Sequence, residues 1–368
     1  MAKRVQIFRG TATVVLGTII KIGELMVNTT RKSLHIGDGV TPGGTELARA
    51  DMNNVADATS STPGRMSAAQ ALLLTQVQSV VDDAAIFGTM GARLSLNNSQ
   101  TGYSMDVSSP TTTMYLVAIN HSRVPVYNTV AAAWEQLDIG DSINGSFAAI
   151  SSNKVFDIFL YSNSDTPTLE FVAWTNTTTR ATSLTTQDGI LVKNGDPSRL
   201  YLGTAYRDAS GCVDDLDRRW LWNQYNRVPR YMLDQFSGTW NYSTAAFRVV
   251  NGATTPSLSF VLGISGCRVN IEHQSCFDNS TATFRNCFVS IAVNNDIATP
   301  STSDGALIQM PASGSSTVVG CPRAVRNQTF GAGLNVVWPL ERGQGSDTQT
   351  WYGSSGNIKS GIWADLEN

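Results

Sequence analysis

Histidines and carboxylates, the side chains that most often carry acid–base chemistry, are sparse and scattered in this chain. A hydrolase triad needs a histidine, and only His35, His121 and His273 occur, none near a Gly-x-Ser-x-Gly nucleophile elbow. Cleavage of a glycan needs two carboxylates that face each other across a groove. The C-terminal part offers four carboxylates for such a pair: Glu272, Asp278, Glu341 and Asp347. No internal repeat of the long β-helix kind accompanies them, so we predict no catalytic residues and no enzyme.

An acidic cluster at Asp214, Asp215 and Asp217 suggests a metal site. A calcium loop would also need a glycine and a terminal glutamate, and neither completes this cluster. Residues 212–225 can begin a helix, with the aspartates at its N-terminus and two of them four residues before an arginine. We therefore predict a solvated structural turn, with no metal and no cofactor.

Aromatic side chains in the last forty residues are better candidates, because they can bind without cleaving. Trp351 and Tyr352 stand between segments rich in Gly, Ser and Asp. An aromatic ring stacks on the C–H face of a sugar while polar neighbours bind its hydroxyls. We predict Trp351 and Tyr352 as receptor-binding residues, with burial in the core or in a subunit interface as the alternative. We prefer that alternative for Trp338 and Trp363, which lie in apolar strands.

Composition limits the class of protein. The 368 residues have a formal net charge of −3 and only 15% charged side chains. Nucleic-acid binding is therefore not expected, because it needs a concentration of Lys and Arg. The many Ser, Thr, Asn and Gly residues favour turns and short strands, so we expect two or three mainly β domains. We find no signal peptide and no run of ~18 apolar residues, so we expect synthesis in a cytoplasm and no membrane insertion.

The five cysteines show neither Cys-x-x-Cys spacing nor histidines in zinc-like order. We expect reduced, mostly buried thiols. A disulfide between two of the four cysteines in the C-terminal part stays open: Cys267, Cys276, Cys287 and Cys321.

The N-terminal segment has the pattern of a small antiparallel module. Two alternating pairs, Leu25/Val27 and Leu34/Ile36, flank a Thr-Thr-Arg-Lys turn and predict a β-hairpin, followed by a glycine-rich loop. Over about residues 5–50 this phrase resembles the N-terminal virion-anchoring module of bacteriophage tail fibres and receptor-binding proteins, including the major tropism determinant type. The resemblance implies that residues 1–50 dock on a phage particle.

A linker and a helix are expected between residues 51 and 90. Ser67 and Gln70 form a capping box, and apolar residues then recur at spacings of three and four. The helix is too short to stand alone in water, so its apolar stripe needs partners. We predict a short coiled-coil neck joining three copies, with packing on the chain's own domain as the alternative. The predicted trimer seam consists of Leu74, Val77, Val81 and Ala84.

A second resemblance runs through the central β domain, residues 91–205, and a connector, residues 206–236. The blocks at 154–159, 179–182, 187–193 and 201–204 occur in an order that is similar to structural proteins of tailed phages. The resemblance implies a virion appendage. Its last block, which we assign to the interdomain connector, contains Trp222, Asn223, Tyr225, Asn226, Arg227, Pro229 and Arg230. We expect Pro229 to end the helix and to direct Arg227 and Arg230 toward the next domain or a neighbouring chain.

Residues 237–368 predict a C-terminal sandwich of jelly-roll type, because many short strands occur without a helix. Alternation is strict over residues 268–272, so one face is buried and the other is wet. We expect His273, which follows Ile271 by two residues, on the wet face.

Together these patterns predict a mainly β homotrimeric fibre of a phage virion, made in the host bacterial cytoplasm. Its N-terminus would contact other tail or baseplate proteins, and its C-terminal tip would bind a host surface glycan or protein. A capsid-attached head fibre or decoration protein of the same build is the nearest alternative. A polysaccharide-degrading tailspike enzyme is the alternative from another class, and a spacer without a receptor is a third.

Overall fold

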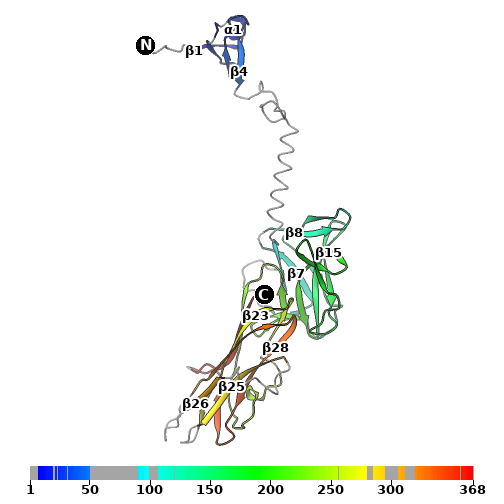
Figure 1. Cartoon of the computed structure of the whole chain (residues 1–368), viewed down its shortest axis with the longest axis vertical. Coiled ribbons are helices and arrows are strands. Elements are labelled where there is room, and N and C mark those ends of the chain that lie inside the picture. Colours follow the sequence, from blue (N-terminus) through cyan, green and yellow to red (C-terminus); the bar gives the residue numbers. More distant parts are fainter. Residues whose placement is uncertain are drawn as a thin grey trace, which may run out of the picture. The chain divides into compact units, whose positions relative to one another are not determined.

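The computed structural model describes residues 7–19, 21–22, 24–30, 32–49, 90–98, 107–119, 121–255, 257–279, 285–294, 306–310, 320–356 and 358–367. The chain divides into two compact units, Met1–Ala85 and Ile86–Asn368. The described segments are mostly strand (Figure 1), which confirms the predicted mainly β class. The predicted neck, with Leu74, Val77, Val81 and Ala84, lies outside the described residues. No helix among the described residues is long and apolar enough to cross a bilayer.

The first unit is a small sheet with one short helix. Its described elements are β1 (Ile7–Gly10), α1 (Ala12–Gly17), β2 (Leu25–Asn28), β3 (Ser33–Ile36) and β4 (Thr45–Arg49). Strands β2 and β3 pair antiparallel, which confirms the predicted hairpin, and the sheet order is β1-β2-β3-β4. Among the described residues of this unit, only Val15 and Met26 form a buried apolar cluster.

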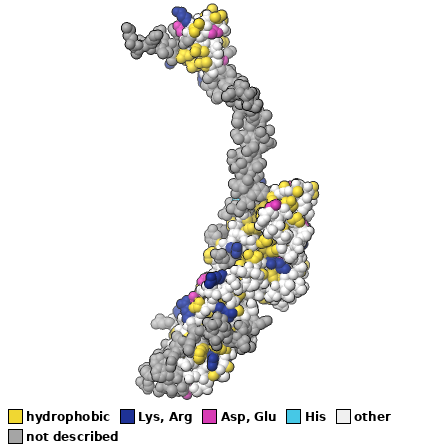
Figure 2. Space-filling model, in the orientation of Figure 1, with side chains coloured by type: hydrophobic (Ala, Val, Ile, Leu, Met, Phe, Trp, Pro, Cys, Tyr) yellow, Lys and Arg dark blue, Asp and Glu magenta, His cyan; other side chains and the backbone are white. Residues whose placement is uncertain are grey.

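Many apolar side chains of this unit face solvent instead of a core. Figure 2 shows hydrophobic side chains over the surface of the first unit. Exposed examples from α1 and the loops are Val14, Leu16, Ile19, Ile22 and Val40. A module with so few buried apolar residues gains stability when another surface covers these side chains.

The first half of the second unit consists of strands that are consecutive in the chain. They are β5 (Ala92–Ser95), β6 (Val107–Thr111), β7 (Thr113–Ala118), β8 (Arg123–Asn128), β9 (Ala133–Asp138), β10 (Ser142–Ser146), β11 (Lys154–Asn163), β12 (Thr166–Ala173), β13 (Leu184–Gln187), β14 (Ile190–Lys193) and β15 (Asp196–Arg207). Strands β10, β7 and β5 form one sheet, and β12-β11-β15-β14-β13 form a larger one. Strands β8 and β9 make a separate hairpin.

The remaining described elements are β16 (Cys212–Asp214), β17 (Arg218–Arg219), β18 (Leu221–Asn223), β19 (Pro229–Gln235), β20 (Thr239–Asn241), β21 (Arg248–Val249), η1 (Val250–Gly252), β22 (Leu258–Leu262), β23 (Cys267–Gln274), β24 (Cys276–Asn279), β25 (Arg285–Val293), β26 (Ala306–Met310), β27 (Arg323–Phe330), β28 (Gly333–Arg342), β29 (Gln349–Tyr352) and β30 (Gly361–Glu367). A large sheet has the order β26-β25-β28-β22-β17-β16-β6, and a second sheet has the order β19-β30-β23-β27. Strand β25 of the large sheet packs against β23 and β27 of the second, so two layers face each other. The jelly-roll connectivity stays a prediction.

Residues 212–225 do not form the expected helix. They form β16, β17 and β18, and the Asp215 carboxylate accepts the Arg218 backbone N–H at 3.0 Å in the turn between the first two strands. Trp220 and Trp222 are both buried, and so is the intervening Leu221 on the other face of the strand. A surface helix would leave one face of this segment in water. A strand that is covered on both faces buries all three of these side chains, so the segment forms strands.

The acidic cluster is also more buried than predicted. Asp214 is 4% exposed, and its carboxylate accepts hydrogen bonds from Arg230 at 2.9 Å and from Arg219 at 3.5 Å. Burial raises the pKa of Asp214 to about 6. Among the described residues no group of three or more His, Cys, Asp or Glu side chains is arranged to hold a metal ion. Asp214 therefore belongs to a buried ion-pair cluster and not to the predicted solvated turn.

Arg180 joins the two halves of the second unit, through an ion pair within the first half and a hydrogen bond to the second. The Arg180 Nε donates to the Asp157 carboxylate at 2.8 Å, and another Arg180 nitrogen donates to the Gly263 carbonyl. Asp157 is only 2% exposed, and its burial raises its pKa. The Arg180 guanidinium also lies 4.5 Å from the centre of the Trp174 ring. Arg180 therefore fixes its loop against both β11 and the turn after β22.

His273 is fully buried between the two layers, which corrects its expected place on the wet face. Residues two apart on a strand share a face, so His273 follows Val269 and Ile271 into the core. Its Nδ1 donates to the Ser290 carbonyl at 2.9 Å, and its Nε2 lies 2.8 Å from the Ser275 hydroxyl. Both ring nitrogens thus have partners that allow a neutral imidazole to be buried.

Two of the five cysteines are oxidised. Cys276 and Cys321 form a disulfide, which is the alternative that the sequence left open, so the expectation of reduced thiols is wrong for this pair. Cys212 and Cys287 are buried and Cys267 is half-buried.

Candidate binding surface

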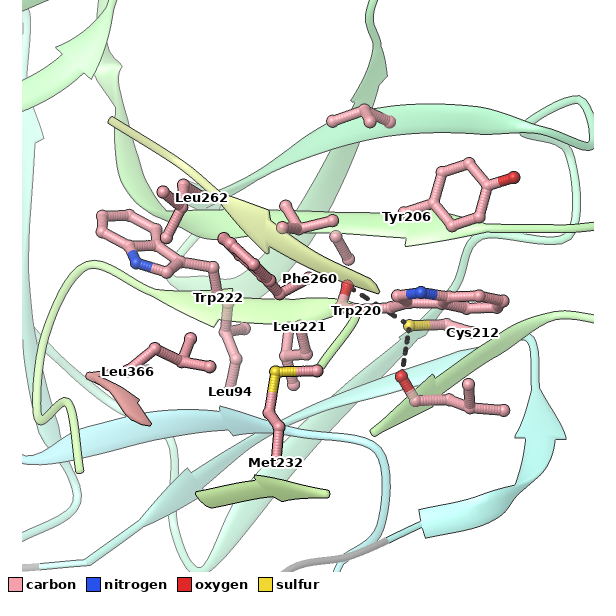
Figure 3. Packing of buried hydrophobic residues seen from close by; sticks show 14 of the residues in the cluster. Leu94, Tyr206, Cys212, Trp220, Leu221, Trp222, Met232, Phe260, Leu262 and Leu366 are labelled. Atoms are coloured by element: carbon pink, nitrogen blue, oxygen red, sulfur yellow. Dashed lines mark hydrogen bonds between the residues drawn. The ribbon is translucent and has the colours of Figure 1, made fainter. Parts of the chain in front are cut away.

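Trp222 and Asn223, two of the predicted connector residues, are buried in the second unit. Figure 3 shows Trp222 beside Leu262 and Leu366, and Trp222 is fully buried. The Asn223 Oδ1 accepts the backbone N–H of Leu94 at 2.8 Å. The Asn226 side chain donates to backbone carbonyls at the start of β5, at 2.9 Å for the carbonyl of residue 92. These contacts fasten β5, where the second unit begins, to its core.

The other connector residues have different environments. Arg230 is buried against Asp214, Pro229 is exposed as the first residue of β19, and Arg227 is exposed. Tyr225 is half-buried, and its burial raises its pKa to about 12. Of the two directions predicted for Arg230, its buried contact with Asp214 excludes a neighbouring chain and leaves the next domain.

Trp351 has a core role instead of the predicted binding role. Its side chain is fully buried in β29, packs on Phe277 with ring centres 5.2 Å apart, and donates from Nε1 to the Tyr242 carbonyl at 3.0 Å. A buried ring cannot stack on a sugar. Tyr352 is half-buried and its hydroxyl donates to Asp278, which raises the Tyr352 pKa to about 12. Its binding role stays a prediction.

Two of the four carboxylates considered for catalysis, Glu341 and Glu272, accept hydrogen bonds from neighbouring side chains. Glu341 is fully buried and accepts hydrogen bonds from Trp240 Nε1 at 2.7 Å and Arg248 Nε at 2.8 Å. Its burial raises its pKa. Glu272 accepts from Trp363 Nε1 at 2.8 Å. Glu341 and Glu272 are thus bound by neighbouring side chains, and the absence of catalysis stays a prediction.

The outer face of the β19-β30-β23-β27 sheet carries the aromatic side chains that a ligand can reach. On β19, Tyr231 and Leu233 point away from the core while Met232 between them is buried. Tyr231 is 46% exposed, so it is one of the most accessible aromatic residues described. Leu233 pairs directly with Trp363 on β30, which places the two side chains next to each other on the outer face.

A cavity of about 210 Å³ lies on this face. Tyr231, Leu233 and Trp363 supply its apolar lining, and Gln235 and Lys359 supply polar groups that can donate hydrogen bonds. An apolar cavity with a few polar groups is the usual form of a small-ligand site. We call it the aromatic cavity.

Trp363 is held in a fixed position by its neighbours. Its Nε1 donates to Glu272, and the Arg323 guanidinium lies 5.3 Å from the centre of its ring. Arg323 also forms an ion pair with Glu272. A ring that is already fixed loses little conformational entropy when a ligand packs against it.

Sequence reasoning missed Tyr231 and preferred burial in the core or in a subunit interface for Trp363. The signal that could have found both is the period-two alternation: Trp363 lies in phase with Asp365, and Tyr231 with Gln235. Trp338, by contrast, is half-buried and packs on the cluster of Val249, Ala292 and Leu340.

Comparisons with known proteins identify no family. No protein-family model matches the chain, and neither does any curated protein. Among solved structures, the Major Tropism Determinant P3c variant is 12% identical with a TM-score of 0.21. The aligned region covers 72% of this chain and 56% of the chain of that variant. Eiger TNF from S. frugiperda is 12% identical with a TM-score of 0.26, covering 38% of this chain and 92% of its own.

The VP2 subviral particle of infectious bursal disease virus is 11% identical with a TM-score of 0.23, and it covers 75% of this chain and 68% of its own. The chain thus spans little more than half the length of the Major Tropism Determinant structure. At these scores none of the three similarities informs the function proposed below.

Proposed function

We propose that this chain is a bacteriophage virion appendage, a homotrimeric tail fibre that binds a glycan on the host cell surface. The observation that carries the binding role is the aromatic cavity on the outer face of the β19-β30-β23-β27 sheet. Tyr231 and Trp363 offer ring faces for the C–H surface of a sugar, and Gln235 and Lys359 offer donors for its hydroxyls.

Docking on the particle is assigned to residues 1–50. The exposed apolar side chains of this unit, such as Val14, Ile22 and Val40, supply a surface for a tail or baseplate protein. A capsid protein would fit the same surface, which is the head-fibre alternative. Labelling of this unit in intact particles separates the two, because the label lies at the tail in one case and on the capsid in the other.

The trimer is tested by the mass of the full chain in light scattering. A mass three times that of one chain supports the fibre. A monomer contradicts it.

Glycan binding is tested on an array of bacterial surface polysaccharides with the full chain. Tyr231→Ala should lower the affinity for any bound polysaccharide at least tenfold, because truncation of an aromatic anchor typically costs about 2 kcal/mol or more. Tyr127→Ala is the matched control, since Tyr127 also packs beside a tryptophan, Trp134, on the distant β8-β9 hairpin. Equal losses in both variants, or none in either, would remove the cavity from the binding site.

We propose binding without cleavage. The tailspike alternative predicts that the chain releases oligosaccharides from the polysaccharide that it binds. Glu341→Ala or Asp347→Ala should then abolish this release. Unchanged polysaccharide after long incubation supports a binding protein only.

A further inference from the structure

A second and larger cavity, of about 400 Å³, lies at the end of the same sheet. It forms where β19 and β23 begin and where β30 ends. Two arginines, Arg227 and Arg268, and one carboxylate, Asp365, line it beside apolar residues that include Leu262 and Leu366. Its charged groups are therefore predominantly cationic. We call it the basic cavity.

Arg227 is held against the core but keeps its hydrogen-bonding groups available. Its guanidinium lies 5.3 Å from the centre of the Trp222 ring, and Trp222 is fully buried. Figure 3 shows Leu262 and Leu366, two lining residues of the basic cavity, beside this same Trp222. Arg227 forms no ion pair with any residue that the structure describes. A guanidinium stacked on an aromatic ring leaves its N–H groups directed outward in the plane.

Arg268 approaches the cavity from β23. It is exposed, and its Nε donates to Asn327 on the neighbouring strand β27. That bond uses one N–H of the five that a guanidinium carries, so donors remain for a ligand. Asp365, in the same phase on β30 as Trp363, is exposed and can accept hydrogen bonds from sugar hydroxyls.

The two cavities follow one another along β19. Pro229 lines the basic cavity, and Tyr231, two residues further on and on the same face of the strand, lines the aromatic cavity. Two residues of a strand span about 7 Å. Neighbouring sugars of one polysaccharide can therefore occupy both cavities.

We propose that the basic cavity binds a carboxylate-bearing sugar, so that the receptor is an acidic, uronate-containing polysaccharide. The planar forks of Arg227 and Arg268 bind the sugar carboxylate, which is the geometry that guanidinium groups match best. Asp365 accepts from the hydroxyls of the same sugar. This inference rests on the glycan-binding role proposed above.

The test uses the full chain on an array of uronate-containing polysaccharides and on the same polysaccharides after their carboxyl groups have been reduced to alcohols. The chain should bind at least one acidic polysaccharide, and carboxyl reduction should weaken that binding at least about tenfold. Arg227→Gln and Arg268→Gln should each weaken it by a similar factor. Arg123→Gln, which changes an exposed arginine on the β8 strand, should leave the affinity unchanged. Binding should also fall with added salt.

The outcomes separate this inference from the proposed function. Binding that requires Tyr231 but is indifferent to carboxyl reduction and to Arg227→Gln would overturn the acidic-sugar site and leave glycan binding standing. Failure to bind any polysaccharide, acidic or reduced, would overturn both. Thermal melting of each arginine variant checks folding, and Arg227→Lys supplies a second measurement, because it keeps the charge and loses the fork. An Arg227→Lys variant that binds the acidic polysaccharide as tightly as the wild type would overturn the bidentate assignment.

Discussion

Acid should destabilise the second unit through His273. This imidazole is fully buried between β23 and β25, and burial lowers its pKa from 6.5 to about 4. The unfolded chain therefore takes up a proton at this side chain near pH 6.5, whereas the folded chain does so only near pH 4. The free energy of unfolding falls as the pH drops through that window.

The size of the effect follows from the pKa difference. The shift corresponds to about 3 kcal/mol of stability that is present above pH 6.5 and lost below pH 4. Between pH 7 and pH 5 the loss is about 2 kcal/mol. Buried carboxyls act in the opposite direction, because the raised pKa values of Asp157, Asp214 and Glu341 favour the folded state as the pH falls. The contribution of His273 must therefore be taken as a difference between two variants.

The assay is urea unfolding of the full chain and of His273→Asn at pH 7 and pH 5, followed by tryptophan fluorescence. All eight tryptophans lie between residues 134 and 363, so the signal reports on the second unit. Asn keeps a donor for the Ser290 carbonyl but does not titrate in this range. We expect the wild type to lose about 2 kcal/mol more than His273→Asn on going from pH 7 to pH 5.

A matched control separates titration from packing. Ile271→Val on the same face of β23 should cost about 1 kcal/mol at both pH values and keep the wild-type pH dependence. Equal pH dependence of the wild type and His273→Asn would refute the reasoning, because the imidazole would then not be held neutral by burial.

Three further predictions concern the core. Arg180→Ala leaves the buried Asp157 carboxylate without its ion-pair partner and should cost about 3–5 kcal/mol in urea unfolding; a cost below 1 kcal/mol would contradict a stabilising role for this ion pair. Asn223→Ala leaves a buried N–H of β5 without its acceptor and should cost about 1–3 kcal/mol, and a neutral result would show that β5 is held otherwise. An unreduced digest should contain Cys276 and Cys321 in one linked peptide by mass spectrometry, whereas alkylation of both without reduction would disprove the disulfide.

Alternation of apolar and polar residues predicted the parts of the fold in which neighbouring segments of the chain pair with each other. The alternation at 25–28 and 33–36 and the turn between them specified the N-terminal hairpin. Alternation over 268–272 correctly separated a buried from a wet face. The helix predicted for residues 212–225 was wrong because the Asp-to-Arg spacings suit both a helix and a tight hairpin. Only pairing with the distant strands β6, β15 and β22 decides between the two.

The candidate site was harder to predict, because exposure depends on which layer covers a strand. Trp351 lies in a polar, glycine-rich context and yet is fully buried. Trp363 lies in an apolar strand and yet faces the outside beside Tyr231, which is far away in sequence. The aromatic composition suggested a sugar as ligand, but the pairing of β19 with β30 determines which aromatic residues lie together on the outer face.

The central claim is that the outer face of the β19-β30-β23-β27 sheet binds a host glycan. Hydroxyl-radical footprinting of the full chain, with and without a saturating bound polysaccharide, tests it most directly because the method labels accessible aromatic side chains. We predict that oxidation of Tyr231 and Trp363 falls in the complex while that of Tyr127 is unchanged. Protection of Tyr127 or of other surfaces, with Tyr231 still oxidised as in the free chain, would contradict the claim.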